Sequence, residues 1–169
     1  MSRSSTPPIW PHADIQLSRQ RLVELCDLVR AIEPGLNNEA ESALARFLVV
    51  RSCGHIEYVL SKSVSEAVRC QSSPRVHGYV DSGLFRGANP KPGRLVETLA
   101  KYDSVLAEEL KGFLEEDDGL LSREIEFLVD RRNKIAHGQS EGIGRVKAMN
   151  LCEHSLDVAD KIADLLNPF

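Results

Sequence analysis

The chain has 169 residues, the usual size of one domain, and its 42% hydrophobic and 27% charged residues are typical of a globular rather than a disordered protein. Aromatic residues make up only 5%, which argues against a β-sandwich and favours helices packed with Leu, Val, Ile and Ala. The formal net charge of −4 excludes a protein that binds nucleic acid over its whole surface, so any basic site must be local.

Residues 1–13 are rich in Ser and Pro, and we expect them to form a flexible leader before a single helical domain over residues 14–169. Within the leader, Trp10 is the candidate residue for docking on this domain. The leader lacks the charged and apolar regions of a secretory signal, and no apolar run approaches the roughly 18 residues that cross a membrane. Four cysteines without regular spacing indicate free thiols in a reducing compartment. We therefore expect a cytoplasmic protein with no membrane partner.

The first helix is predicted to begin at Asp14 and to end before Pro34, because apolar residues recur at helical spacing between them. The second begins at Asn38, where Glu41 completes a variant of the capping box, and no proline interrupts it before Pro74. The apolar stripe of the first helix is Ile15, Leu22, Leu25, Val29 and Ile32. That of the second is Val49, Cys53, Ile56, Leu60 and Val64, and a second apolar face carries Phe47, Tyr58 and Val59. The second helix is therefore predicted to be the central, most buried one.

Residues 69–94 predict an irregular insertion with at most short helices, because prolines and glycines punctuate them. Basic residues, among them Arg75 and Arg86, alternate here with Tyr79 and Phe85. This composition suits the bases and backbone of unpaired RNA, and a solvated surface loop explains it equally well.

Helices are predicted again from Arg94 and from Ser104, and an acidic break at residues 115–119 precedes a penultimate helix over about Leu120–His137. The last helix is predicted to begin near Ile143. Its apolar face is Met149, Cys152, Leu156, Ala159, Ala163 and Leu166. No stretch alternates as a strand would. The sequence therefore predicts an all-α bundle of four to five helices, with the irregular insertion between the second and third principal helices.

An arginine lies on the apolar stripe of the penultimate helix. The stripe runs through Leu121, Ile125 and Leu128 to Arg132 and Ile135. A guanidinium is costly there unless it is paired or meets a ligand. Asn133 and His137 share a neighbouring face, whereas Arg132 and His137 lie roughly 140° apart around the helix. They could converge only through the long arginine side chain, a distorted helix end or a second subunit. Cations also complement the dipole in a last turn, and spacing alone favours that structural role.

Residues 132–137 (RNKIAH) resemble the R-x4-6-H signature, often RN-x-x-AH, of the HEPN superfamily. Its members are compact all-α domains, and many are metal-independent RNases of toxin–antitoxin, abortive-infection and CRISPR-linked defence systems. The layout of residues 38–168 is also similar, especially to the RiboL-PSP-like branch: an apolar helix with an arginine (47–57) comes early, and a last helix follows the motif. The resemblance implies a HEPN-type bundle and a homodimer in which two motifs face one cleft.

The resemblance further implies a metal-independent endoribonuclease without a cofactor, with Arg132, Asn133 and His137 as catalytic residues. An imidazole with a pKa of about 6.5 can transfer the protons of 2′-OH attack, which leaves a cyclic phosphate. An arginine fork matches phosphoryl oxygens, and Asn133 can orient the scissile phosphate or the imidazole. One imidazole cannot readily act as both acid and base, and a dimer supplies two.

The implied partners are an RNA substrate and a cognate antitoxin or defence-system protein. Some members of the superfamily are inactive, so the alternative is a catalytically silent HEPN module that binds a partner protein or a nucleotide. In one branch, a partner nucleotidyltransferase modifies a Tyr two residues after the His. Gln139 stands at that position, and we do not expect this mode of control.

Further residues are candidates for RNA binding or for metal ligation. The RNA-binding candidates are Arg131, Lys134, Arg51, Glu57, Arg75 and Arg86. Arg51 and Glu57 either form an internal ion pair or extend the floor of the cleft. The pairs Cys53/His55 and Cys152/His154 look like metal ligands, but helix residues two apart diverge by roughly 200° and cannot chelate one ion. We therefore expect no metal site.

Overall fold

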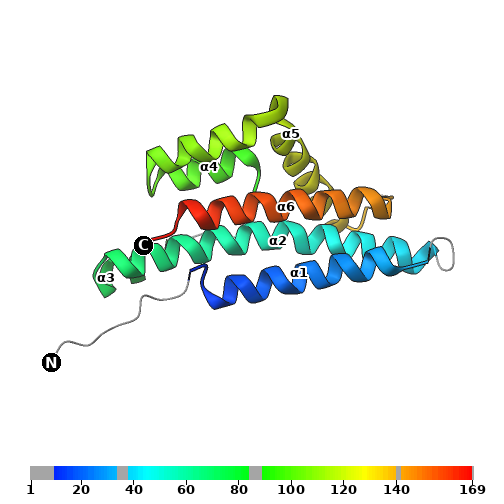
Figure 1. Ribbon diagram of the computed structural model, residues 1–169, viewed down its shortest axis with the longest axis horizontal. Helices are drawn as coiled ribbons and strands as arrows, with labels where there is room; N and C mark the ends of the chain where they lie inside the picture. Colours follow the sequence, from blue (N-terminus) through cyan, green and yellow to red (C-terminus); the bar gives the residue numbers. More distant parts are fainter. Residues whose placement is uncertain (1–9, 34–37, 84–88, 140–141, 169) are drawn as a thin grey trace.

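The computed structural model describes residues 10–33, 38–83, 89–139 and 142–168, which form six helices and no strand (Figure 1). The helices are α1 (Ala13–Ala31), α2 (Asn38–Gln71), α3 (Pro74–Gly83), α4 (Pro92–Ala100), α5 (Ser104–Ala136) and α6 (Arg145–Leu165). This architecture confirms the all-α helical bundle. None of the described helices has both the length and the apolar character that crossing a bilayer requires.

Three long helices, α1, α2 and α6, lie side by side along the long axis of the molecule (Figure 1). α2 runs antiparallel to α1, and α6 runs parallel to α2 (Figure 1). α4 packs against the first part of α5, and the last part of α5 contacts both α2 and α6. The C-terminal end of α5, which carries the predicted motif, is thereby placed against the middle of the bundle.

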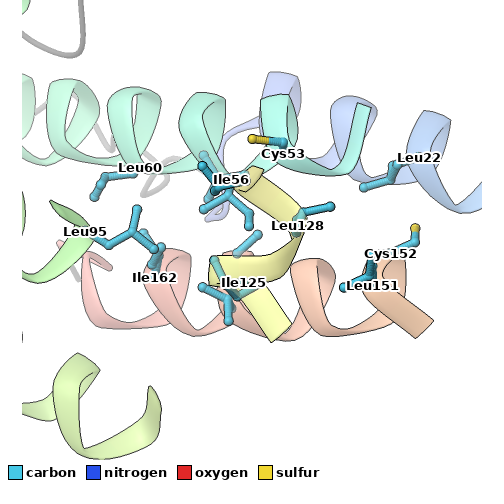
Figure 2. Close-up of a cluster of buried hydrophobic side chains, with 14 of the residues drawn as sticks. Leu22, Cys53, Ile56, Leu60, Leu95, Ile125, Leu128, Leu151, Cys152 and Ile162 are labelled. Carbon is cyan, nitrogen blue, oxygen red and sulfur yellow. The ribbon is translucent and has the colours of Figure 1, made fainter. Parts of the chain in front are cut away.

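The core confirms that α2 is the central helix. Its whole predicted stripe is buried, namely Val49, Cys53, Ile56, Leu60 and Val64. Figure 2 shows Ile125 and Leu128 of α5 reaching between the core side chains of α2 and α6. The predicted second apolar face is wrong for two residues, since Phe47 is 51% and Tyr58 is 38% exposed. Both lie on a side of α2 that the neighbouring helices leave open, whereas Val59 is buried.

The other helices follow their predicted stripes with small shifts. In α1, Cys26 joins Ile15, Leu22 and Val29 in the core, and Leu25 and Ile32 are half-buried. In α6, Cys152, Ala159, Ala163 and Leu166 are buried, and Met149 and Leu156 are half-buried. The described part of the insertion contains the short helix α3, which buries none of its residues.

The expected docking of Trp10 occurs at the C-terminal end of α6. The indole Nε1 of Trp10 donates a hydrogen bond of 2.8 Å to the backbone oxygen of Ala163. The chain therefore packs on the domain from Trp10 onward rather than from Asp14. Residues 1–9 of the expected flexible leader lie outside the described residues.

The predicted acidic break is a turn that divides α5 into two helical segments. Asp117, Asp118 and Gly119 have positive φ angles of 50°, 55° and 73°. Asp tolerates this left-handed conformation better than most residues, and glycine adopts it without a side-chain clash. The Arg123 guanidinium donates to the Asp118 backbone oxygen across the turn. Because of this change of direction, the second segment of α5 crosses α2 and α6, and this crossing positions the motif.

Candidate active site

Arg132 lies on α5 one turn after the buried Leu128, where its side chain is half-buried. Its Nη1 donates to the Oδ1 atoms of Asn89, at 3.1 Å, and of Asn133, at 3.2 Å. Within the described residues no carboxylate forms an ion pair with this guanidinium, and Nε and Nη2 have no hydrogen-bond partner. Two neutral amides thus hold the side chain without neutralising it, which leaves a positive charge available to a ligand.

His137 is the residue at which α5 ends. Its backbone N–H donates to the Asn133 oxygen at 3.0 Å, its φ and ψ of −88° and 10° depart from helical values, and its side chain is exposed. Gly138 follows with a φ of +71°, as is common just beyond a helix C-terminus. The imidazole lies at the surface, and no hydrogen bond in the described part of the chain joins it to Arg132.

The guanidinium of Arg132 borders an open groove of about 570 Å³ between α1 and α2. We call it the arginine groove. Its lining residues are Asp14, Leu17, Ser18, Arg21, Val50, Arg51, Gly54, His55, Tyr58 and Arg132. The predicted candidate Arg51 is therefore brought together with Arg132, and Arg21 of α1 adds a third guanidinium.

Sequence reasoning missed the α1 wall of this groove. Asp14, Leu17, Ser18 and Arg21 follow the spacing i, i+3, i+4 and i+7, which places them on one face of α1. That spacing was a signal for a second functional face beside the apolar stripe. Asn89, which holds Arg132, lies in the linker before α4, and no sequence pattern singled it out.

Glu57 and Arg51 do not form the ion pair that was one of the two expectations. Arg51 is exposed in the arginine groove, whereas Glu57 is half-buried on another side of α2 and accepts from the Cys53 Sγ at 4.0 Å. Residues six apart lie roughly 120° apart around a helix, which explains the separation. Burial raises the pKa of Glu57, while the nearby Arg132 acts to lower it. Burial also raises the pKa of the Cys53 thiol to about 12.

His55 is buried beneath the arginine groove at 4% exposure. A hydrogen bond of 2.9 Å joins its Nδ1 to the Oγ of Ser18, and its Nε2 has no partner among the described residues. Burial lowers the pKa of His55 to about 4, with Arg19 and Arg51 acting in the same direction and Asp160 against them. The ring is therefore neutral near pH 7.

The candidate metal ligands point to different surroundings. Cys53 contacts Glu57, whereas His55 contacts Ser18. In the second pair, Cys152 is buried and His154 lies 3.7 Å from a Glu124 oxygen. Among the described residues, no three His, Cys, Asp or Glu side chains gather closely enough to hold a metal ion.

The remaining RNA-binding candidates are dispersed. The Arg131 guanidinium lies over the Phe127 ring at 4.6 Å, and Lys134 is half-buried in the last turn of α5. Arg75 is exposed on α3, beyond the C-terminal end of α2 and roughly 25 Å along that helix from Gly54 at 1.5 Å per residue. Arg86 lies outside the described residues.

Comparison with known proteins supports the assignment of the chain to the HEPN superfamily. The model of the family described as RiboL-PSP-HEPN matches residues 14–168, which span all six helices. No curated protein and no solved structure matched the chain. HEPN domains are often nuclease modules. A match of this extent shows that the chain belongs to the RiboL-PSP-HEPN family, and so to the HEPN superfamily.

Proposed function

We propose that this protein is a metal-independent endoribonuclease, acting as a toxin or effector of a bacterial toxin–antitoxin or anti-phage defence system. One observation carries the proposal: in a HEPN-family chain, the half-buried Arg132 is held by two amide oxygens and borders a groove with two further arginines. A charge kept in this way suits a phosphate that bears developing negative charge.

In the proposed reaction, the 2′-oxygen of one nucleotide attacks the adjacent phosphorus, and the bond to the 5′-oxygen breaks. A neutral His137 accepts the 2′-OH proton, and a protonated imidazole donates a proton to the leaving 5′-oxygen. Arg132 stabilises the phosphorane through its open Nε and Nη2 groups, and Asn133 fixes the guanidinium through its Oδ1. The products are a 2′,3′-cyclic phosphate and a 5′-hydroxyl.

The two proton transfers call for two imidazoles, and one chain presents a single exposed His137 beside its motif. We propose a homodimer in which both motifs line one cleft, so that a second copy of His137 supplies the other proton transfer. Sedimentation at micromolar concentration should give a dimer. A monomer under all conditions would count against the composite cleft.

The alternative function is a catalytically silent HEPN module that binds a partner protein or a nucleotide, in an antitoxin-like or scaffold role. The exposure of His137 outside the arginine groove and the net charge of −4 favour it. Expression in growing bacteria separates the two functions. A ribonuclease toxin should arrest growth and degrade cellular RNA, and a silent module should do neither.

The direct test uses purified protein and an RNA substrate in EDTA. We expect cleavage without a divalent metal, with products that end in 2′,3′-cyclic phosphate. Cleavage that requires Mg²⁺ and leaves 5′-phosphates would contradict the proposed chemistry.

A further inference from the structure

The positive charges of the arginine groove are hardly neutralised by carboxylates of the same chain. Within the described residues, neither Arg21 nor Arg51 forms an ion pair or a hydrogen bond, and the hydrogen bonds of Arg132 go only to amide oxygens. The one carboxylate in the lining, Asp14, lies 3.5 Å from the Lys62 Nζ. It is also roughly 10 Å along α1 from Arg21, at 1.5 Å per residue. Three arginines around one concave surface are suited to binding an anion.

The same groove offers apolar surface beside these charges. Leu17 of α1 is 45% exposed and Tyr58 of α2 is 38% exposed, and both line the groove. Gly54 lies on α2 between Arg51 and Tyr58, and a Cβ built on it would meet no atom within 4 Å. The glycine therefore leaves open space where most residues would place a side chain. An exposed aromatic ring that lines the same groove as these arginines suits the flat face of a nucleobase.

Ser18 and His55 supply a neutral hydrogen-bond donor to this surface. The neutral imidazole carries one proton, and its Nε2 has no partner. A buried donor without an acceptor is rarer than a buried acceptor without a donor, so the favoured tautomer carries the proton on Nδ1. In that tautomer, Nδ1–H donates to the Ser18 Oγ. The Ser18 hydroxyl proton is then available to a ligand in the groove.

We propose that the arginine groove binds one nucleotide of single-stranded RNA next to the scissile bond. Arg21 and Arg51 contact its phosphate oxygens, Tyr58 and Leu17 contact its base, and Ser18 donates a hydrogen bond. The identification of the strand as RNA rests on the proposed function. Because Arg132 borders the groove, a nucleotide held there has a neighbouring phosphate at the proposed reaction centre.

The dimensions favour an unpaired nucleotide over a duplex. A volume of about 570 Å³ lies in the range of roughly 300–1,000 Å³ typical of small-ligand pockets. In a duplex the base faces are stacked on one another, and side chains cannot reach them. Single strands expose both the base face and the phosphate, which are the two surfaces that this groove complements.

Direct binding tests the groove independently of cleavage. The probe is a short fluorescent single-stranded RNA with 2′-O-methyl riboses, which cannot undergo 2′-OH attack, and fluorescence anisotropy is recorded over a range of salt concentrations. We expect Arg21→Gln to weaken binding about tenfold or more. The slope of log K against log[salt] should fall by about 0.7, the value for one phosphate contact with a single strand.

Gly54 provides a graded steric series, because Ala and Leu add increasing volume at an exposed helix position. The loss of affinity should grow from Gly54→Ala to Gly54→Leu. The matched control is Arg19→Gln, two residues before Arg21 on α1 but paired outside the groove with Asp160. Its affinity and salt slope should equal those of the unmodified protein. Thermal denaturation verifies that each variant is folded.

The inference is overturned if Arg21→Gln and Gly54→Leu both bind like the unmodified protein, or if the matching duplex binds more tightly than the single strand. Binding that depends on the groove, in a protein that cleaves no RNA, would contradict the proposed function and leave the groove assignment standing. Cleavage whose KM is unchanged by both groove substitutions would contradict the groove assignment and leave the proposed function standing.

Discussion

Two sets of arginines on the same bundle differ in what surrounds them. The groove arginines are Arg21, Arg51 and Arg132, and the paired arginines are Arg19, Arg30 and Arg69. Arg19 donates from Nε to both carboxylate oxygens of Asp160, at 2.9 and 3.0 Å, and this hydrogen bonding raises its pKa. Arg21 is two residues away on the same helix and has no carboxylate partner in the described part of the chain.

This difference separates stability from function. An exposed ion pair such as Arg19–Asp160 stabilises the fold slightly. Unpaired arginines that share a concave surface repel one another, and we propose that a bound ligand accounts for them. Substitution of a groove arginine should therefore mainly impair function, and substitution of a paired arginine should only slightly lower the free energy of unfolding.

The largest expected effect belongs to Arg132→Ala. Removing the proposed phosphorane-stabilising group should lower the cleavage rate about 10²-fold or more. Some stability should also be lost, because the aliphatic stem of Arg132 lies on the core stripe of α5. Single-turnover cleavage of a labelled RNA measures the rate. Cleavage at the unmodified rate would show that this arginine is not part of the reaction centre.

A core substitution one turn earlier should mainly lower the stability of the fold, because it removes no group from the proposed reaction centre. Leu128 is fully buried, and Leu128→Ala should lower the free energy of unfolding by about 2–5 kcal/mol through lost burial and a residual cavity. Chemical denaturation measures this change. A loss smaller than that of Arg132→Ala would mean that the bundle is not held together by this interface between α2, α5 and α6.

His55 should make stability depend on pH. Its folded-state pKa of about 4 lies below the ordinary value of 6.5, so the unfolded chain binds more protons between these values. Its contribution to stability is therefore complete above about pH 6.5 and falls as the pH drops towards 4, by about 3 kcal/mol. Urea denaturation at several pH values should show a weaker pH dependence in His55→Gln than in the unmodified protein. Equal pH profiles would contradict a buried, neutral His55.

The smallest expected effect is that of Arg19→Ala. Its side chain and that of Asp160 are 46% and 45% exposed, so losing the pair should lower the free energy of unfolding by at most about 1 kcal/mol. RNA cleavage should be unaffected. A substantial loss of cleavage in this variant would remove the distinction between the paired and the groove arginines.

The sequence predicted much of this arrangement because helical periodicity is a local property. The stripe from Val49 to Val64 identified the central helix, and the acidic residues before Gly119 marked the turn in α5. The resemblance in residues 132–137 identified the family. These features depend only on neighbouring residues.

The missed features depend on which helix faces meet. The spacing along α1 cannot show that Ser18 and Arg21 face Arg51 across a groove, and nothing local pairs Asn89 with Arg132. Tyr58 looked like a core residue because it is aromatic, yet the bundle leaves its side of α2 uncovered. Long-range packing decides such positions.

The central claim is that residues 132–137 form the reaction centre, and His137→Ala tests it most directly. The ring is exposed at the end of α5, so its removal should change the free energy of unfolding by at most about 1 kcal/mol. RNA cleavage in EDTA should fall about 10²-fold or more, whereas His154→Ala, at a histidine beside Glu124, should cleave normally. Full cleavage by a folded His137→Ala protein would contradict the assignment of nuclease activity to this motif.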